Sequence, residues 1–150
     1  MSEGPAELRV SREVLRQAVE EMIPFNRYLG LVLTAITPGF ARVELPFRPE
    51  LIGDPFRPAL HGGVLSALID ACAGAALWTR VEPADKISTI DLRVDYLRPG
   101  EPELIICEAH VIRLGGRIGV VDARVFHPGA PERTIATGKG VYNVRRFKKA

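Results

Sequence analysis

Three residues have the types and spacing that a reactive site requires. They are the glycines Gly62 and Gly63 and the carboxylate of Asp70. Residues 64–78 are otherwise small or apolar, and Ser66 is the only other polar side chain among them. A helix without a polar face is expected to lie inside a domain, where a carboxylate is costly unless it is paired, protonated or hydrogen-bonded. Asp70 is therefore either a structural group that bonds a neighbouring backbone or subunit, or a group that performs chemistry.

The two glycines favour the chemical interpretation. Glycine lets a backbone approach another group closely, and the first N–H groups of a helix lack internal partners and carry the positive end of its dipole. Gly62 and Gly63 therefore predict a site for an oxyanion. A rise of ~1.5 Å per residue places Asp70 about 12 Å along the helix from Gly62, too far for both to touch one carbon atom. If they cooperate, Asp70 comes from a second copy of the helix in a two-fold dimer with antiparallel helices.

A resemblance to a known family rests on six residues: His61, Gly62, Gly63, Val64, Leu68 and Asp70. Their pattern resembles the hotdog-fold acyl-CoA thioesterases, specifically the phenylacetate-pathway and 4-hydroxybenzoyl-CoA thioesterase-like group, over roughly residues 25–145. The resemblance implies that the N–H of Gly62 polarises a thioester carbonyl and that Asp70 of the partner subunit acts as nucleophile or general base. It also implies a homodimer, and a tetramer built as a dimer of dimers.

Further site residues follow from the same resemblance. The family often places a Ser or Thr near the carboxylate to hold the attacking water, and Thr89 stands at that point. It often carries Asn six positions before the His-Gly-Gly histidine, where this chain has Pro55. The neighbouring Asp54 is a candidate substitute, although a carboxylate cannot donate an amide hydrogen bond. His61 is a candidate acid or ligand, but we interpret it as the residue that sets the turn before Gly62.

Binding of coenzyme A requires cations for its phosphate groups. Arg98, Arg113 and Arg117 lie at expected loop or strand-end positions and are named as candidates, together with Gly63 next to the oxyanion site. The usual interpretation of any single arginine is a solvated surface residue. The basic residues near the end of the chain, from Arg145 onward, are expected to form a solvated and partly frayed tail.

Composition excludes several other classes of function. A net charge of +2 gives no footprint for nucleic acid. The three histidines and two cysteines show no metal-ligand spacing and no disulfide framework, so Cys72 and Cys107 are expected to be core residues and no metal or redox cofactor is expected. Ser66 and Ser88 lack the context of a nucleophile elbow. No leader or membrane-spanning segment is recognised, so a cytoplasmic protein without membrane or nucleic-acid partners is expected.

The elements that would position these residues can be predicted from periodicity. Ser11 is a good N-cap for an amphipathic helix that Pro24 ends, and residues 28–37 and 40–46 form a strand hairpin around Pro38-Gly39. The proline-rich residues 48–60 are expected to be an irregular loop. After the apolar helix come four strands: 87–97, 104–113, 118–126 and 134–144.

This order predicts an α+β hotdog fold with a curved antiparallel sheet of five to six strands around a central helix. The 150 residues suit one domain, which we divide into a covering segment 1–24, a hotdog domain 25–146 and a basic tail 147–150. We expect a thioesterase that hydrolyses acyl-CoA or aryl-CoA. The alternatives are an acyl-CoA-binding hotdog module without catalysis, which gains little from a buried acid, and a hydratase, which needs a His–acid pair that the chain does not suggest.

Overall fold

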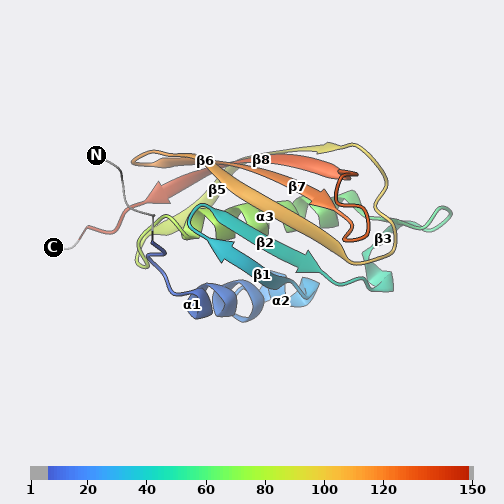
Figure 1. Ribbon diagram of the computed structural model, residues 1–150, viewed down its shortest axis with the longest axis horizontal. Coiled ribbons are helices and arrows are strands. Elements are labelled where there is room, and N and C mark those ends of the chain that lie inside the picture. Colours follow the sequence, from blue (N-terminus) through green and yellow to red (C-terminus); the bar gives the residue numbers. More distant parts are fainter. Residues whose placement is uncertain (1–6, 149–150) are drawn as a thin grey trace.

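The computed structural model describes residues 7–148. Its main feature is a six-stranded antiparallel sheet wrapped around one long helix, α3 (Gly62–Trp78) (Figure 1). The strands are β1 (Val32–Thr37), β2 (Phe40–Leu45), β5 (Lys86–Tyr96), β6 (Ile105–Leu114), β7 (Ile118–Phe126) and β8 (Ala136–Arg145). They lie in the order β1-β2-β6-β7-β8-β5. The α+β hotdog architecture expected from the sequence is confirmed.

The core lies between α3 and the concave face of the sheet. On β2 every second residue is buried, and the charged Arg42 and Glu44 alternate with them on the outer face. Small residues on the sheet let the helix approach closely: a Cβ added at Gly138 of β8 would lie only 2.5 Å from the side chain of Ile69 on α3. The alternation that predicts the strands therefore also defines the surface on which α3 packs.

The N-terminal helices differ from the single helix that was expected to end at Pro24. They are α1 (Arg12–Gln17), the π-helical η1 (Ala18–Met22) and α2 (Pro24–Leu29). Pro24 begins α2 because proline fits the first position of a helix, where its missing N–H is not needed and its fixed φ is already helical. The strand expected from Tyr28 therefore starts only at Val32, after Gly30 has ended α2 with a φ of 77°.

These helices cover one edge of the sheet, as expected for the N-terminal segment. Ser11 caps α1, and its Oγ accepts a hydrogen bond from the N–H of Val14 at 3.2 Å. The carboxylate of Glu20 accepts a hydrogen bond from the N–H of Leu33 on β1 at 2.9 Å. Figure 1 shows α1 and α2 alongside β1. None of the helices among residues 7–148 combines the length and apolar character needed to cross a membrane.

The expected irregular loop over residues 48–60 contains short regular elements. They are the 3-10 turn η2 (Pro49–Leu51) and the two-stranded hairpin of β3 (Ile52–Asp54) and β4 (Ala59–Leu60). The hairpin packs tightly on the start of α3, because a Cβ at Gly53 would lie 2.6 Å from the Cα of His61. The N–H of His61 also donates to the carbonyl of Leu51 at 2.9 Å. Prolines therefore limit this segment to short elements without making it irregular.

In a single chain α3 is not buried on every side, contrary to the expectation from its composition. A stripe of mostly small residues along one side is only half-buried, and it comprises Val64, Ala67, Asp70, Ala71, Gly74 and Trp78. The adjacent edge strand β5 is exposed or half-buried along its whole length. The sheet and helix thus leave one uncovered side, formed by the α3 stripe and β5.

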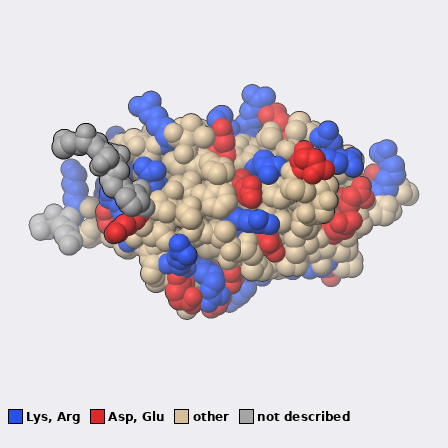
Figure 2. Space-filling view, in the orientation of Figure 1, with Lys and Arg blue, Asp and Glu red and all other residues tan. Residues whose placement is uncertain are grey.

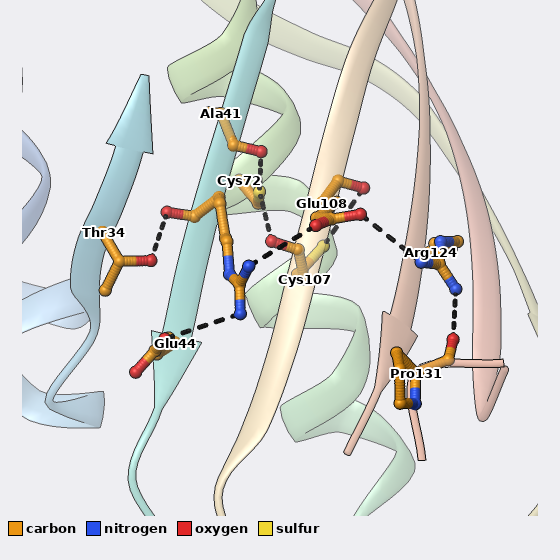
Figure 3. A network of polar contacts seen from close by, with 9 residues as sticks. Thr34, Ala41, Glu44, Cys72, Cys107, Glu108, Arg124 and Pro131 are labelled. Carbon is orange, nitrogen blue, oxygen red and sulfur yellow. Dashed lines mark hydrogen bonds and ion pairs between the residues drawn. The ribbon is translucent and has the colours of Figure 1, made fainter. Parts of the chain in front are cut away.

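The outer face of the sheet carries paired charges of both signs, which are interspersed over the surface seen in Figure 2. Glu108 on β6 lies 3.8 Å from the guanidinium of Arg42 on β2 and 3.5 Å from that of Arg124 on β7 (Figure 3). Beneath this network the thiol of Cys72 donates to the carbonyl oxygens of Ala41 and Cys107. Both cysteines are buried and free, which confirms their expected place in the core.

Candidate active site

Asp70 lies in the middle of α3, and two hydroxyl groups donate to its carboxylate. Thr89 Oγ1 on β5 donates to Oδ1 at 2.9 Å. Tyr142 Oη on β8 lies 3.0 Å from the same oxygen and 3.2 Å from the carbonyl oxygen of Asp70. Among residues 7–148 no hydrogen bond or ion pair reaches Oδ2. The carboxylate therefore has one oxygen held by neutral donors and one oxygen available to a substrate or water.

Tyr142 reaches Asp70 because of its place on the inner face of β8. A Cβ added at Gly140, two residues earlier on the same face, would lie 2.5 Å from the Tyr142 ring, so only glycine leaves room for this ring position. Burial, followed by the negative charge of Asp70, raises the pKa of Tyr142 far above its ordinary value. The phenol therefore keeps its proton and acts as a hydrogen-bond donor.

A cavity of about 300 Å³ opens beside Asp70 and is within the size range of small-molecule sites. Besides Asp70, Thr89 and Tyr142, its polar lining includes the buried Asn26 of α2 and Ser88 of β5. The apolar part of its lining comes from the N-terminal helices, α3 and β5, and includes Val19, Ile23, Phe25, Trp78 and Ile87. The N-terminal helices, expected only to cover the domain, thus form one wall of this cavity.

Gly62 begins α3, and its N–H is the one near the helix start that is left free. His61 Nδ1 accepts from the N–H of Gly63 at 2.8 Å, and the His61 carbonyl accepts from the N–H of Val64 at 2.9 Å. Among residues 7–148 the N–H of Gly62 has no acceptor. His61 is thus the N-cap of α3 and sets the turn, as we interpreted it, while the N–H of Gly63 is used inside the helix cap. The free N–H of Gly62 lies at the positive end of the helix dipole.

A single chain does not bring Gly62 and Asp70 together. Gly62 lines a separate surface hollow of about 360 Å³ with Tyr96 and Arg98, and Asp70 does not line it. Tyr96 Oη donates to the carbonyl of Gly62 at 3.1 Å, which fixes the start of the helix against β5. The sequence-based spacing argument, that one chain cannot supply both groups to one carbon, agrees with this arrangement.

The remaining candidates are spread over the molecule. Asp54 accepts hydrogen bonds from the N–H groups of Arg57 and Phe56, which hold the pKa of its carboxyl below the ordinary value, and it does not line the Asp70 cavity. Arg98 donates to the carbonyl of Thr134.

Arg113 and Arg117 flank the turn between β6 and β7, at the end of the molecule where α3 finishes. Arg98 instead lies beside the start of α3. Within one chain the three arginines therefore do not form one cluster.

Sequence reasoning missed Tyr142 and Asn26. The inward positions of β8 are occupied by Ala136, Gly138, Gly140, Tyr142 and Val144. Tyr142 is the one member of this series with a polar group, which is a signal that the sequence does contain. Asn26 falls between the helix expected to end at Pro24 and the strand expected from residue 28, so its place on a helix beside the cavity was not visible.

Comparisons with known proteins bear on this geometry. A family model described as "Thioesterase superfamily" matches residues 58–132. The medium/long-chain acyl-CoA thioesterase YigI of Escherichia coli strain K12 is 33% identical over 135 residues, which cover 81% of this chain and 86% of that protein. A putative esterase of Halobacterium salinarum, VNG_1336C, is 32% identical over 126 residues, which cover 79% of this chain and 83% of that protein.

Solved structures show the same architecture. A protein described as belonging to the thioesterase superfamily superposes with a TM-score of 0.81 and 30% identity, covering 89% of this chain and 97% of its own. A protein of Shewanella oneidensis, described as related to the thioesterase superfamily, has a TM-score of 0.75 and 29% identity, covering 87% and 93% of the two chains.

Proposed function

Because the chain belongs to the thioesterase superfamily, we propose that it is an acyl-CoA thioesterase, which hydrolyses acyl-CoA thioesters to a free acid and coenzyme A. The observation that carries the proposal is the carboxylate of Asp70, held through one oxygen by Thr89 and Tyr142 and free at the other, beside a largely apolar cavity. A binding pocket without catalysis has little use for such a group, because burying a carboxylate disfavours binding of an apolar chain.

In the proposed reaction Asp70 acts as general base. It takes a proton from a water molecule as the water oxygen attacks the thioester carbonyl carbon. The carbonyl oxygen becomes an oxyanion that accepts a hydrogen bond from the free N–H of Gly62. The C–S bond then breaks, the proton passes from Asp70 to the leaving sulfur, and a carboxylic acid and a thiol result. Direct attack by Asp70, followed by hydrolysis of the resulting anhydride, is the nucleophilic form of the same proposal.

The site is proposed to form between two chains. The half-buried stripe of mostly small residues on α3 and the exposed edge strand β5 provide an uncovered surface on which a second copy can lie antiparallel. A two-fold axis near the first half of α3 places Gly62 of one chain beside Asp70 of the other, twice in each dimer. A dimer of such dimers remains the expectation from the family resemblance.

The proposed substrates are thioesters with medium or long acyl chains. The E. coli relative carries this specificity in its name, and the apolar lining of the cavity, with Trp78 and Ile87, suits an alkyl chain better than a polar one. An aryl-CoA substrate, which the sequence left open, is the competing possibility. A panel of acyl-CoA and aryl-CoA thioesters tests both, with release of free thiol as the readout.

The two-chain site has its own experiment. Chains carrying Asp70→Asn and chains carrying Gly62→Ala are each expected to be nearly inactive. When the two are unfolded together and refolded as a mixture, the mixed dimers regain one intact site, so about a quarter of wild-type activity returns. A mixture that stays inactive although native mass spectrometry shows mixed dimers contradicts the shared site. Acyl-CoA binding without any turnover by the wild-type protein would instead favour the binding module.

A further inference from the structure

A basic hollow with an aromatic side chain lies at the end of the molecule where α3 finishes. It has a volume of about 420 Å³ and is lined by Ala84, Lys86, Arg145, Arg146, Phe147 and Lys148. Lys86 and Arg145 face each other as paired residues on the neighbouring strands β5 and β8. The ring of Phe147 is 66% exposed, although a large apolar side chain without a partner is usually buried. The hollow thus combines several positive charges with an uncovered aromatic face.

Asp85 holds this segment in place, so the expected frayed tail does not begin at Arg145 or at 147. Its side chain is 2% exposed, and the carboxylate accepts hydrogen bonds from the guanidinium of Arg146 at 2.8 Å and from the N–H of Phe147 at 2.9 Å. Arg146 also donates to the carbonyls of Gly115 and Gly116 in the β6–β7 turn. A buried carboxylate thus fixes the backbone that carries Phe147 and Lys148.

The other cations of the hollow have no carboxylate partner among residues 7–148. Within residues 7–148, Arg146 neutralises Asp85, whereas no ion pair involves Lys86, Arg145 or Lys148. The nearby Glu82 is itself paired with Arg9. Three like charges held close together without an anion repel one another, and a ligand with several negative charges removes this repulsion.

We propose that this hollow binds the nucleotide part of coenzyme A, with the adenine stacked on Phe147 and the phosphate groups bound by Lys86, Arg145 and Lys148. The inference rests on the proposed function and names a second part of its substrate site. Adenine suits an exposed aromatic ring flanked by cations, because it has a flat face and adjoins charged phosphates. None of Arg98, Arg113 and Arg117, which the sequence suggested for this role, lines the hollow.

The position of the hollow also fits a substrate that reaches Asp70. Lys86 begins β5 and Thr89 follows three residues later, so a strand rise of ~3.3 Å per residue places their backbones about 10 Å apart, with the two side chains on opposite faces of the sheet. Thr89 touches Asp70 directly. The phosphopantetheine arm, a long flexible chain between nucleotide and thioester, would then pass around the start of β5, from the outer face of the sheet to the cavity.

The test compares substrates with and without the nucleotide. Wild-type protein and the variants Lys86→Ala/Arg145→Ala and Phe147→Ala are assayed with decanoyl-CoA and with decanoyl-N-acetylcysteamine, which lacks the nucleotide and phosphates. The charge variant should raise KM for decanoyl-CoA about tenfold or more, because each charge-assisted hydrogen bond contributes strongly to binding. KM for the N-acetylcysteamine thioester and kcat for both substrates should stay unchanged. Arg12→Ala, an exposed cation on α1, is the matched control.

Direct binding separates this proposal from the proposed function. Calorimetry with coenzyme A, and with dephospho-coenzyme A lacking the 3′-phosphate, measures binding without turnover. If wild-type protein hydrolyses decanoyl-CoA but neither variant weakens KM or binding, the nucleotide site is wrong and the thioesterase proposal stands. If coenzyme A binds and the variants weaken it, but no thioester is hydrolysed, the site stands and the catalytic proposal fails.

Discussion

Asp70 lies in the middle of α3, and Asp85 lies in the connection between α3 and β5. The hydrogen-bond partners of their carboxylates differ in kind. Asp85 is buried and uses both oxygens, one for the guanidinium of Arg146 and the N–H of Glu82 and the other for the N–H of Phe147. Asp70 is half-buried, receives only neutral hydroxyl donors on one oxygen, and has no cation partner among residues 7–148.

This difference indicates different roles. A carboxylate with a cation and backbone donors on its two oxygens is stabilised in its ionised form, and the burial of Asp85 keeps a substrate away from it. A carboxylate held at one oxygen by neutral donors is oriented but can still accept a proton at the other. The comparison therefore favours a structural role for Asp85 and agrees with the proposed catalytic role of Asp70. Substitutions at the two positions should affect different measurements.

The largest expected effect is that of Asp70→Asn on activity. Asparagine keeps the shape of the side chain but cannot act as a base, so we expect kcat for acyl-CoA hydrolysis to fall about 10³-fold or more. The free energy of unfolding should be equal or higher, because a charge that is costly to bury has been removed. Thiol release and urea unfolding on the same preparation measure the two effects. Retained turnover, or a clear loss of stability, would reverse the assignment of Asp70.

Gly62→Ala tests the other half of the proposed site. An added Cβ would lie 3.3 Å from the Tyr96 ring, which is tight contact that a small side-chain movement relieves, so the protein should still fold. Displacement of the N–H donor should lower kcat by about 10²–10³-fold. Gly129→Ala is a control for the loss of a glycine, because a Cβ there meets nothing within 4 Å and Gly129 lies outside the α3 stripe and the cavity lining. Normal kcat in a folded Gly62→Ala protein would exclude the oxyanion role.

Asp85→Asn should show the opposite pattern to Asp70→Asn. The substitution leaves Arg146 without its charge partner and weakens the bonds to backbone N–H groups, so stability should fall by about 2 kcal/mol. The kcat with the N-acetylcysteamine thioester should be unchanged at temperatures where the variant is folded. Urea unfolding at neutral pH measures the first effect. An unaltered stability would remove the structural role assigned to Asp85.

The stability that Asp85 contributes should also depend on pH. Burial alone would raise the pKa of Asp85, but the N–H of Phe147, the guanidinium of Arg146 and the N–H of Glu82 together hold it below its ordinary value. A carboxyl with a depressed pKa in the folded state stabilises the protein above the unfolded-state pKa of about 3.9 and loses this contribution as pH falls further. The stability difference between wild type and Asp85→Asn should therefore be constant near neutrality and shrink below about pH 4.

Much of the fold could be predicted because it depends on local patterns. Alternation in the strands and an apolar helix with a central carboxylate specify which faces meet, and the structure confirms that arrangement. Pro24 was misinterpreted because proline both ends one helix and begins another, and the sequence alone does not distinguish the two uses. The β3–β4 hairpin was missed because it depends on contacts with His61 rather than on periodicity.

The site was predictable only in part. The contact between Thr89 and Asp70 is present as expected, although its role in catalysis stays a prediction. The contact of Tyr142 with Asp70 joins residues 72 positions apart. Strand alternation predicts that Tyr142 lies on the inner face of the sheet, but not which residue of the helix it contacts. The same limit applies to the C-terminal segment, which appeared free in the sequence because its partner Asp85 lies 62 positions before Phe147.

The smallest expected effect on activity is that of Tyr142→Phe. It tests directly whether a neutral donor orients the carboxylate of Asp70. Phenylalanine keeps the buried ring and removes only the hydroxyl that donates to Asp70 Oδ1, so stability should change little. Thr89 still holds the carboxylate, and kcat should fall only about tenfold, in line with the loss of one hydrogen bond to a charged group.

The double variant Tyr142→Phe/Thr89→Val distinguishes a positioning role from simple packing. It leaves Oδ1 of Asp70 without either donor, so kcat should fall further than the two single effects combined, while KM stays the same. A packing defect would instead lower the free energy of unfolding, and the effects of the two single changes on kcat would simply add. That result would mean that α3 alone orients Asp70, and that the hydrogen bonds to Oδ1 do not make it different from Oδ2.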